Sequence, residues 1–207
     1  FERSKQVRQI LPKSYIRTNT NSDFIKKDVI DKAKESGFDE ILMMIYLPKN
    51  KTFSREYSLK RVEMMSKKLG LNYTIITDID VEFKVKFHID GLDLYMKARD
   101  FDKTASSRGG TLKLKEKIAR EKPCFLPFNG VYIDYNGSYM PCCCLRSDEV
   151  THEKYISGNV EKKTIFDSFM SSTLIEFRKT VLLFGQKKGV CEECNMGLGL
   201  QLKDWRK

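Results

Sequence analysis

The sequence predicts an α/β protein. Its first half is expected to form β/α units around a parallel sheet, and its second half a small α+β cysteine-rich region with a β-hairpin. Residues 15–77 alternate short apolar runs with segments of helical periodicity, the order that places parallel strands side by side. All six cysteines follow residue 123, beginning with Cys124. We therefore expect two domains, residues 1–110 and residues 111–207.

The first half repeats an order of strand and helix. Strands are expected at residues 15–20, 41–46 and 73–77, and helices at residues 24–36 and 54–69. Residues 41–46 are continuously apolar, as in a strand buried on both faces of a parallel sheet. Gly37 and Gly70 follow the two helices and are natural C-terminal stops. Residues 81–89 are expected to be extended, and residues 93–98 helical.

A β-hairpin is expected at the start of the second half. Asn136-Gly137 lies between two apolar stretches, which predicts a two-residue type I′ turn. Such a turn pairs Ile133 with Met140 and Val131 with Cys142. Cys142 would then share an apolar face with its neighbours, as a metal cluster requires.

The rest of the second half gives weaker signals. Apolar spacing predicts one helix over residues 165–183, and Gly158-Asn159 predicts a turn. The mostly charged residues 111–121 suit a linker or a short exposed helix. Of the two histidines, His152 lies in a polar stretch that suggests the surface, and His88 is expected to be structural.

Four cysteines have the spacing of a metal site, Cys-x17-Cys-x48-Cys-x2-Cys, formed by Cys124, Cys142, Cys191 and Cys194. The Cys-x-x-Cys pair can place two thiolates on one metal with little chain strain. Four soft thiolates suit an iron–sulfur cubane, but a structural zinc uses the same set. Free core thiols are a further alternative, and disulfides are disfavoured without a secretory signal. Cys143 or Cys144 could replace Cys142 as the ligand.

Composition limits the class of protein. The net charge of +10 permits phosphate-bearing or acidic partners, but the lysines are scattered and no aromatic-rich nucleic-acid motif is present, so nucleic acid is not expected. No apolar run reaches the ~20 residues of a membrane-spanning helix, and no signal peptide is visible, so we expect a cytoplasmic protein without a membrane partner. The chain starts at Phe1 without an initiator methionine, which suggests a truncated or processed piece.

Several of these residues together resemble a known family. Cys124, Gly137-Ser-Tyr-Met-Pro-Cys142 and Cys191-x-x-Cys194 are similar to the SPASM/twitch domain of radical S-adenosylmethionine (radical SAM) enzymes. Ser107-Arg108-Gly109-Gly110 is similar to the segment at the boundary of that domain, and Gly158-Asn159 and the helix with Arg178 also fit. The resemblance covers about residues 105–197. Residues 15–77 resemble the middle of the incomplete, TIM-like parallel β/α barrel that precedes such domains.

The resemblance implies a cofactor and a role. The single-cluster twitch form carries one auxiliary [4Fe-4S] cluster, with Cys124, Cys142, Cys191 and Cys194 as its metal ligands. The cluster would transfer electrons or position a substrate, a peptide or a small molecule, during hydrogen abstraction by an oxidoreductase or modifying enzyme. The Cys-x3-Cys-x2-Cys loop of the catalytic cluster is absent from this sequence, so S-adenosylmethionine and a second [4Fe-4S] cluster are expected only with a missing N-terminal segment.

Two other functions stay open at this stage. The chain could be a non-catalytic iron–sulfur module for electron transfer or binding, or a zinc-stabilised interaction domain. Whether the chain is an enzyme is therefore undecided, with an enzyme fragment favoured. A partner chain could also complete the barrel. The residues do not assign any catalytic or S-adenosylmethionine-binding side chain.

Overall fold

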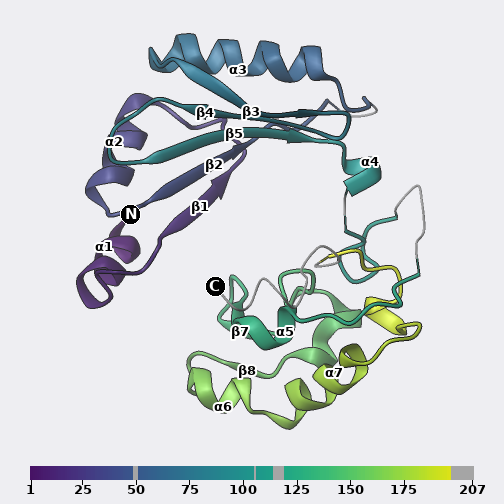
Figure 1. Cartoon of the computed structure of the whole chain (residues 1–207). Helices are drawn as coiled ribbons and strands as arrows, with labels where there is room; N and C mark the ends of the chain where they lie inside the picture. The colour runs from purple at the N-terminus through teal and green to yellow at the C-terminus, as the bar shows by residue number, and fades with distance from the viewer. Residues whose placement is uncertain (49–50, 105, 114–118, 197–207) are drawn as a thin grey trace. The chain divides into compact units, whose positions relative to one another are not determined.

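The structure is a computed structural model that describes residues 1–48, 51–104, 106–113 and 119–196 (Figure 1). The chain folds into two compact units, Phe1–Thr104 and Ala105–Lys207. The boundary predicted after residue 110 lies inside the second unit. The glycine-rich segment that ends at Gly110 thus belongs with the cysteines.

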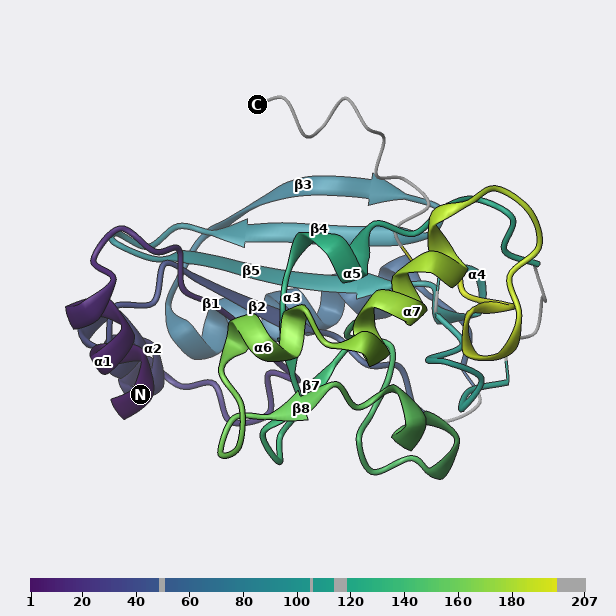
Figure 2. The ribbon, with the colours of Figure 1, turned by 90° about the horizontal axis from the view of Figure 1, so that it is seen from below.

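The first unit is built on a five-stranded mixed sheet with the order β1-β2-β5-β4-β3 (Figure 2). Strands β1, β2 and β5 are parallel, whereas β5, β4 and β3 are antiparallel. The strands are β1 (Arg17–Thr20), β2 (Glu40–Met44), β3 (Tyr73–Ile79), β4 (Glu82–Phe87) and β5 (Asp93–Arg99). The parallel part of the predicted sheet is confirmed for β1 and β2, but β3 is an antiparallel edge strand.

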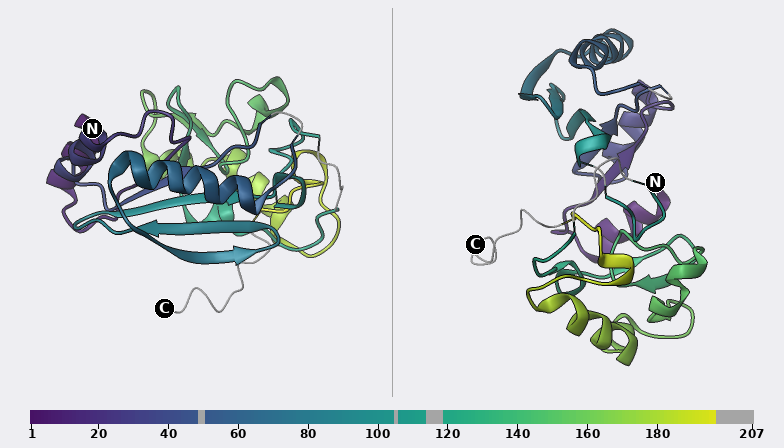
Figure 3. Two further views of the ribbon diagram at one scale, coloured as in Figure 1. Left: turned by 90° about the horizontal axis from the view of Figure 1, so that it is seen from above. Right: turned by 90° about the vertical axis from the view of Figure 1, so that its right-hand side faces the viewer.

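Helices accompany these strands: α2 (Lys27–Glu35) and α3 (Arg55–Leu69) connect strands, α1 (Glu2–Ile10) precedes β1, and α4 (Phe101–Thr104) follows β5. The Ser54 hydroxyl accepts a hydrogen bond from the Tyr57 amide and caps α3, which ends at Gly70 in a left-handed conformation (φ 68°). Figure 3 shows α3 lying along the sheet, and Val62 and Met65 of α3 join the same core cluster as Ile30 of α2.

The core shows why one element was predicted wrongly. Residues 93–98 form strand β5 and not a helix. Leu94, Met96 and Ala98 are completely buried and alternate with less buried neighbours, the period of two that a strand imposes. In the sequence, so short a segment does not distinguish this alternation from helical spacing. The pairing of β5 with β2 on one side and β4 on the other shows that it is a strand.

The second unit contains a small antiparallel sheet in the order β6-β7-β8 and short helices around it. Its elements are α5 (Leu126–Asn129), β6 (Tyr132–Ile133), β7 (Ser138–Met140), the 3-10 helix η1 (Val150–Tyr155), β8 (Gly158–Asn159), α6 (Ile165–Phe169), α7 (Ser172–Leu182) and the 3-10 helix η2 (Gly189–Cys191). Gly158-Asn159, predicted as a turn, pairs with β7 instead. The predicted helix 165–183 is two helices, because the Ser171 hydroxyl accepts from the Leu174 amide and starts a new one.

The β6–β7 pair has a register that differs from the prediction by one residue. Tyr132 lies opposite Met140. The connecting loop is one residue longer than a type I′ turn: the Gly137 amide donates to the Asp134 carbonyl at 2.9 Å, and Gly137 is left-handed at φ 81°. Since a one-residue slip exchanges the two faces of a strand, Tyr132 packs on the core while Ile133 is exposed.

Residues 114–118 of the charged stretch 111–121 lie outside the described residues, so the prediction of a linker or a short helix there stays a prediction. Within the ranges that the structure describes, no helix combines the length and the hydropathy needed to cross a membrane.

Candidate metal centre

The second unit draws its cysteines together from separate chain segments. One precedes α5, three follow β7, and two lie at and after η2. All are free thiols: Cys124, Cys144 and Cys194 are buried, Cys142 and Cys191 are half-buried, and Cys143 is exposed. Cys143 is thus the most exposed residue of the group, although its thiol also shares a hydrogen bond with Cys144, which lowers its pKa to about 6.

Backbone hydrogen bonds and apolar packing hold these segments. The Cys124 amide donates to the Val181 carbonyl at 2.9 Å, which fixes this cysteine against the end of α7. Cys124 shares a buried cluster with Met140, Leu145, Phe177 and Val181, and Cys142 and Cys191 pack against that cluster. An apolar shell of this kind excludes water, as an iron–sulfur cluster requires.

The predicted ligands lie close enough to change one another's acidity. Burial, followed by the Cys142, Cys194 and Cys124 thiols, raises the pKa of Cys191 to about 12. Burial likewise raises the pKa of Cys124, with the thiols of Cys142 and Cys194 acting in the same direction. The structure therefore gathers all four predicted ligands around one place.

A fifth thiol lies among them. A hydrogen bond from Cys144 is the largest cause that lowers the pKa of Cys142, and a bond from the same thiol lowers the pKa of Cys194 to about 6. The pKa of Cys144 itself is raised by these bonds, and its sulfur lies 3.4 Å from the Ser106 hydroxyl. The sequence already left Cys144 as an alternative to Cys142, and the geometry keeps both near the site.

Arg120 holds the Cys-x-x-Cys loop in place. Its Nη1 donates to the carbonyls of Cys194, at 3.1 Å, and Met196, at 2.5 Å, and its Nη2 donates to Pro123. Its own amide donates to the Glu192 carbonyl at 2.7 Å. The sequence does not indicate this role, because Arg120 ends a run of charged residues, where a cation normally lies on a solvated surface.

The segment before Cys124 supports the same site. His152 is completely buried, contrary to the surface position predicted from its polar neighbours. Its Nδ1 accepts from the Arg146 amide at 3.1 Å, and its Nε2 lies 3.1 Å from the Gly109 carbonyl, to which it donates. With both nitrogens occupied, His152 is a structural link and not a metal ligand. Gly109 is required there, because a Cβ atom would lie 2.6 Å from that Nε2.

The donor set suits an iron–sulfur cluster. Buried soft thiolates, the Arg120 guanidinium and the buried Ser107 hydroxyl, which has no hydrogen-bond partner in the described part of the chain, are groups that an anionic cluster can use. Over the same residues, no three His, Cys, Asp or Glu side chains are arranged to hold one metal ion. A [4Fe-4S] cubane is larger than a single metal ion and binds thiolates that are further apart. The kind of donor atoms present, and not a single-ion geometry, is therefore what fits this site to a cubane.

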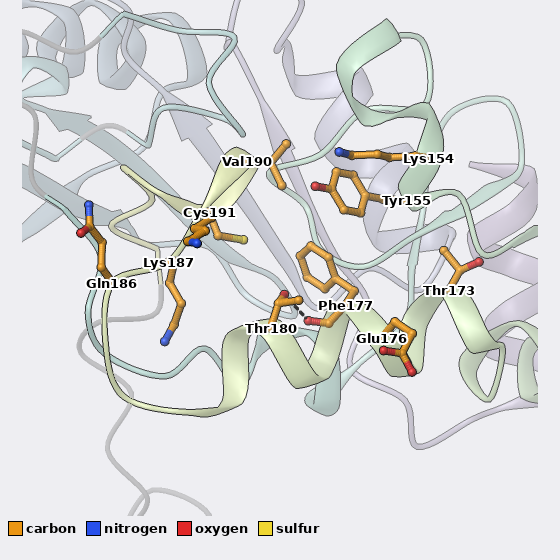
Figure 4. A pocket seen from close by; sticks show the side chains of 12 residues that line it. Lys154, Tyr155, Thr173, Glu176, Phe177, Thr180, Gln186, Lys187, Val190 and Cys191 are labelled. Carbon is orange, nitrogen blue, oxygen red and sulfur yellow. Dashed lines mark hydrogen bonds between the residues drawn. The ribbon is translucent and has the colours of Figure 1, made fainter.

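A cavity of about 690 Å³ opens beside one predicted ligand (Figure 4). Cys191 lines it together with Tyr155 and Phe177, and Figure 4 shows the Cys191 sulfur directed towards these rings. Lys154 and Lys188 also line the cavity. This volume is typical of a site for a small molecule.

In the first unit, the acidic side chains of β3 and β4 are paired with cations. Asp78 accepts two hydrogen bonds from Arg55 Nε at 2.8 Å, and Glu82 pairs with Lys97 at 2.5 Å. His88 Nε2 lies 2.7 Å from the Thr74 hydroxyl. These contacts are those of a sheet surface.

Comparison with known proteins gives a family match for the second unit. Residues 124–195 match SPASM, an iron–sulfur cluster-binding domain. The fold is similar to that of BtrN in complex with AdoMet and 2-DOIA (TM-score 0.56, 17% identity) and of SeMet BtrN in an open conformation (TM-score 0.52, 15% identity). Each similarity covers 93% of this chain, which spans only 64% and 62% of those chains. No curated protein matches the sequence.

Proposed function

We propose that this chain, whose residues 124–195 match SPASM, works in association with radical SAM chemistry and holds one auxiliary [4Fe-4S] cluster, as in the twitch form. The ligands would be Cys124, Cys142, Cys191 and Cys194. When bound, such a cluster supplies a one-electron carrier that can accept an electron from a substrate radical or orient a substrate.

One observation carries the proposal. The four predicted ligands come from three separate chain segments, yet their thiols influence one another, and Cys124, Cys142 and Cys191 lie in or against one apolar cluster. A fold has little reason to concentrate free thiols at one buried place unless they bind a soft metal centre. The SPASM match covers the same residues from the first ligand to the last.

Cys142 is preferred to Cys144 as the second ligand. It occupies the cysteine position of the Gly-x4-Cys element that begins at Gly137, and it lies against the apolar cluster with Cys124 and Cys191. Cys144 would then act as a hydrogen-bond donor to the ligand thiolates. Such donors stabilise thiolate charge and are a usual part of iron–sulfur sites.

The cavity beside Cys191 is a candidate place for the substrate, a small molecule or a peptide side chain. Lys154 and Lys188 line it, while Glu176, also in its wall, is neutralised by Lys179 at 2.7 Å. The cavity therefore favours a ligand with a carboxylate or phosphate group and an apolar part that packs on Tyr155.

Hydrogen abstraction needs more than these residues. The 207 residues contain no Cys-x3-Cys-x2-Cys motif, so S-adenosylmethionine and a catalytic cluster are proposed only where that motif accompanies this chain, in a longer protein or in a partner chain. The five-stranded sheet of the first unit would then be part of an incomplete β/α barrel. A reducing cytoplasmic setting would keep the thiols free for metal.

Anaerobic purification tests the cluster directly. We expect a brown protein that absorbs near ~400 nm and contains iron and sulfide in equal amounts. Replacing Cys191 and Cys194 by Ala should remove both elements, whereas Cys143→Ala, at the exposed thiol of the same group, should retain them. A colourless protein with stoichiometric zinc would refute the proposal in favour of a zinc-stabilised domain.

Two single variants test the choice between neighbouring thiols. We expect Cys142→Ala to lose the cluster and Cys144→Ala to keep it. The opposite result would move the second ligand to Cys144 without changing the rest of the proposal.

A further inference from the structure

Arg120 is the largest completely buried side chain in the described residues, with 2% of its surface exposed. Its guanidinium donates to four backbone carbonyls, those of Lys122, Pro123, Cys194 and Met196. All four of these acceptors are neutral oxygens. No carboxylate forms an ion pair with it within the parts of the chain that the structure describes.

A buried guanidinium held only by neutral oxygens is unfavourable, because carbonyl dipoles replace water but supply no opposite charge. Proteins normally place an anion next to such a cation or bring it to the surface. The position of Arg120 therefore indicates that an anion shares its environment in the functional protein.

The cysteine thiolates are candidates for that anion. Arg120 acts electrostatically on Cys124, Cys191 and Cys194, three of the four proposed ligands. Its hydrogen bonds to Pro123 and Cys194 place its guanidinium directly beside two of the ligand segments. Four thiolates outweigh the positive charge of an oxidised cluster core, so a loaded site is anionic, and it gains one further negative charge on reduction.

We propose that Arg120 is the counter-ion of the auxiliary cluster and raises its reduction potential. This inference rests on the proposed function, since it requires the cluster at these cysteines. The guanidinium stabilises the reduced state more than the oxidised state, because the reduced state carries the greater negative charge. The step is a transfer of one electron to the cluster from a substrate radical, or from dithionite in the assay, and no bond forms or breaks.

The test is a redox titration of the full chain followed by electron paramagnetic resonance of the reduced cluster. Arg120→Gln removes the charge and keeps two hydrogen-bonding groups, and we expect reduction to become about tenfold less favourable, ~59 mV for one electron. Arg120→Lys keeps the charge and should stay within about threefold of the wild-type equilibrium.

Arg178 provides the matched control. It is also buried, its Nε donates to the Pro127 carbonyl at 3.0 Å, and its Nη1 donates to Phe169 at 2.7 Å. Arg178→Gln therefore removes a buried guanidinium from the same unit without touching a cysteine segment. We expect it to lower the stability of the unit and to leave the reduction potential unchanged.

The outcomes separate the two proposals. Wild-type protein without iron and sulfide would refute the proposed function itself. With a cluster present, a change below about threefold in Arg120→Gln, or an equal change in Arg178→Gln, would overturn the role of Arg120. If Arg120→Gln loses its cluster, Arg120→Lys decides: a cluster within about threefold of the wild-type equilibrium supports the proposal, and a larger shift or a lost cluster overturns it.

Discussion

Substituting Gly109 by Ala tests how the glycine-rich segment is joined to the cysteine-bearing unit. Gly109 has a left-handed φ of 66°, and an added Cβ would lie 2.6 Å from both His152 Nε2 and Leu145 Cδ2. Neither neighbour can yield easily, because both are almost completely buried. We expect the substitution to push the imidazole away and break its 3.1 Å hydrogen bond to the Gly109 carbonyl.

Two contributions determine the size of the effect. An L residue in the left-handed region costs about 1–2 kcal/mol, and the loss of a buried hydrogen bond costs about 1–3 kcal/mol. Gly110→Ala is the matched control: Gly110 also has a positive φ, 92°, but no atom lies within 4 Å of its added Cβ. The hydrogen bond therefore contributes about 1–3 kcal/mol to the difference between Gly109→Ala and Gly110→Ala, and the close contact of the added Cβ with Leu145 acts in the same direction.

Hydrogen–deuterium exchange of peptides covering residues 142–156 measures this difference locally. The Arg146 amide donates to His152 Nδ1, so its protection reports directly on the position of the imidazole. We expect exchange to be roughly 5- to 150-fold faster in Gly109→Ala than in Gly110→Ala. Equal exchange in the two variants would show that the His152 contact does not hold this segment, and would refute the reasoning.

Two further predictions concern the first unit. The hydrogen bond from the Ile16 amide, helped by Arg8, holds the pKa of Asp39 below its usual range against the opposing effect of burial, so this stabilisation is present above about pH 4 and is lost as the pH falls through the lowered value. Asp39→Asn should flatten the loss of thermal stability between about pH 5 and about pH 2, and an unchanged acid slope would contradict the assignment. Met96→Ala, at a completely buried position of β5, should cost about 2–5 kcal/mol in the free energy of unfolding, whereas Ile76→Ala, which is 50% exposed on β3, should change it by less than about 0.5 kcal/mol. Similar midpoints for these two variants in urea would argue against β5 as a central strand.

Local sequence signals were sufficient where contacts between residues close in the sequence decide the structure. The apolar run that became β2 and the Gly70 stop act within a few residues, and the strand and the helix they predict are present. The cysteine spacing was equally informative, because a Cys-x-x-Cys pair and a Gly-x4-Cys element have few other uses. The match to a cluster-binding domain covers those residues.

The hairpin register could not be obtained in this way. Asn136-Gly137 favours a two-residue turn, but the Asp134 carboxylate accepts hydrogen bonds from the Ser147 amide, at 2.7 Å, and hydroxyl, at 2.8 Å. The Asn136 side chain accepts from the same hydroxyl at 2.9 Å. These bonds come from a segment beyond the hairpin, and they hold the longer loop that exposes Ile133.

The sequence by itself determined the chemistry of this protein: which thiols are available, their spacing, and the family whose pattern they share. Only the tertiary structure decided what surrounds them. His152 and Arg120 both lie in polar stretches that suggest a solvated surface, and both are buried because their partners are backbone carbonyls from distant segments. Every residue has a backbone carbonyl, so the sequence does not indicate which carbonyl a side chain will contact. Contacts of this kind are recognisable only in the folded structure.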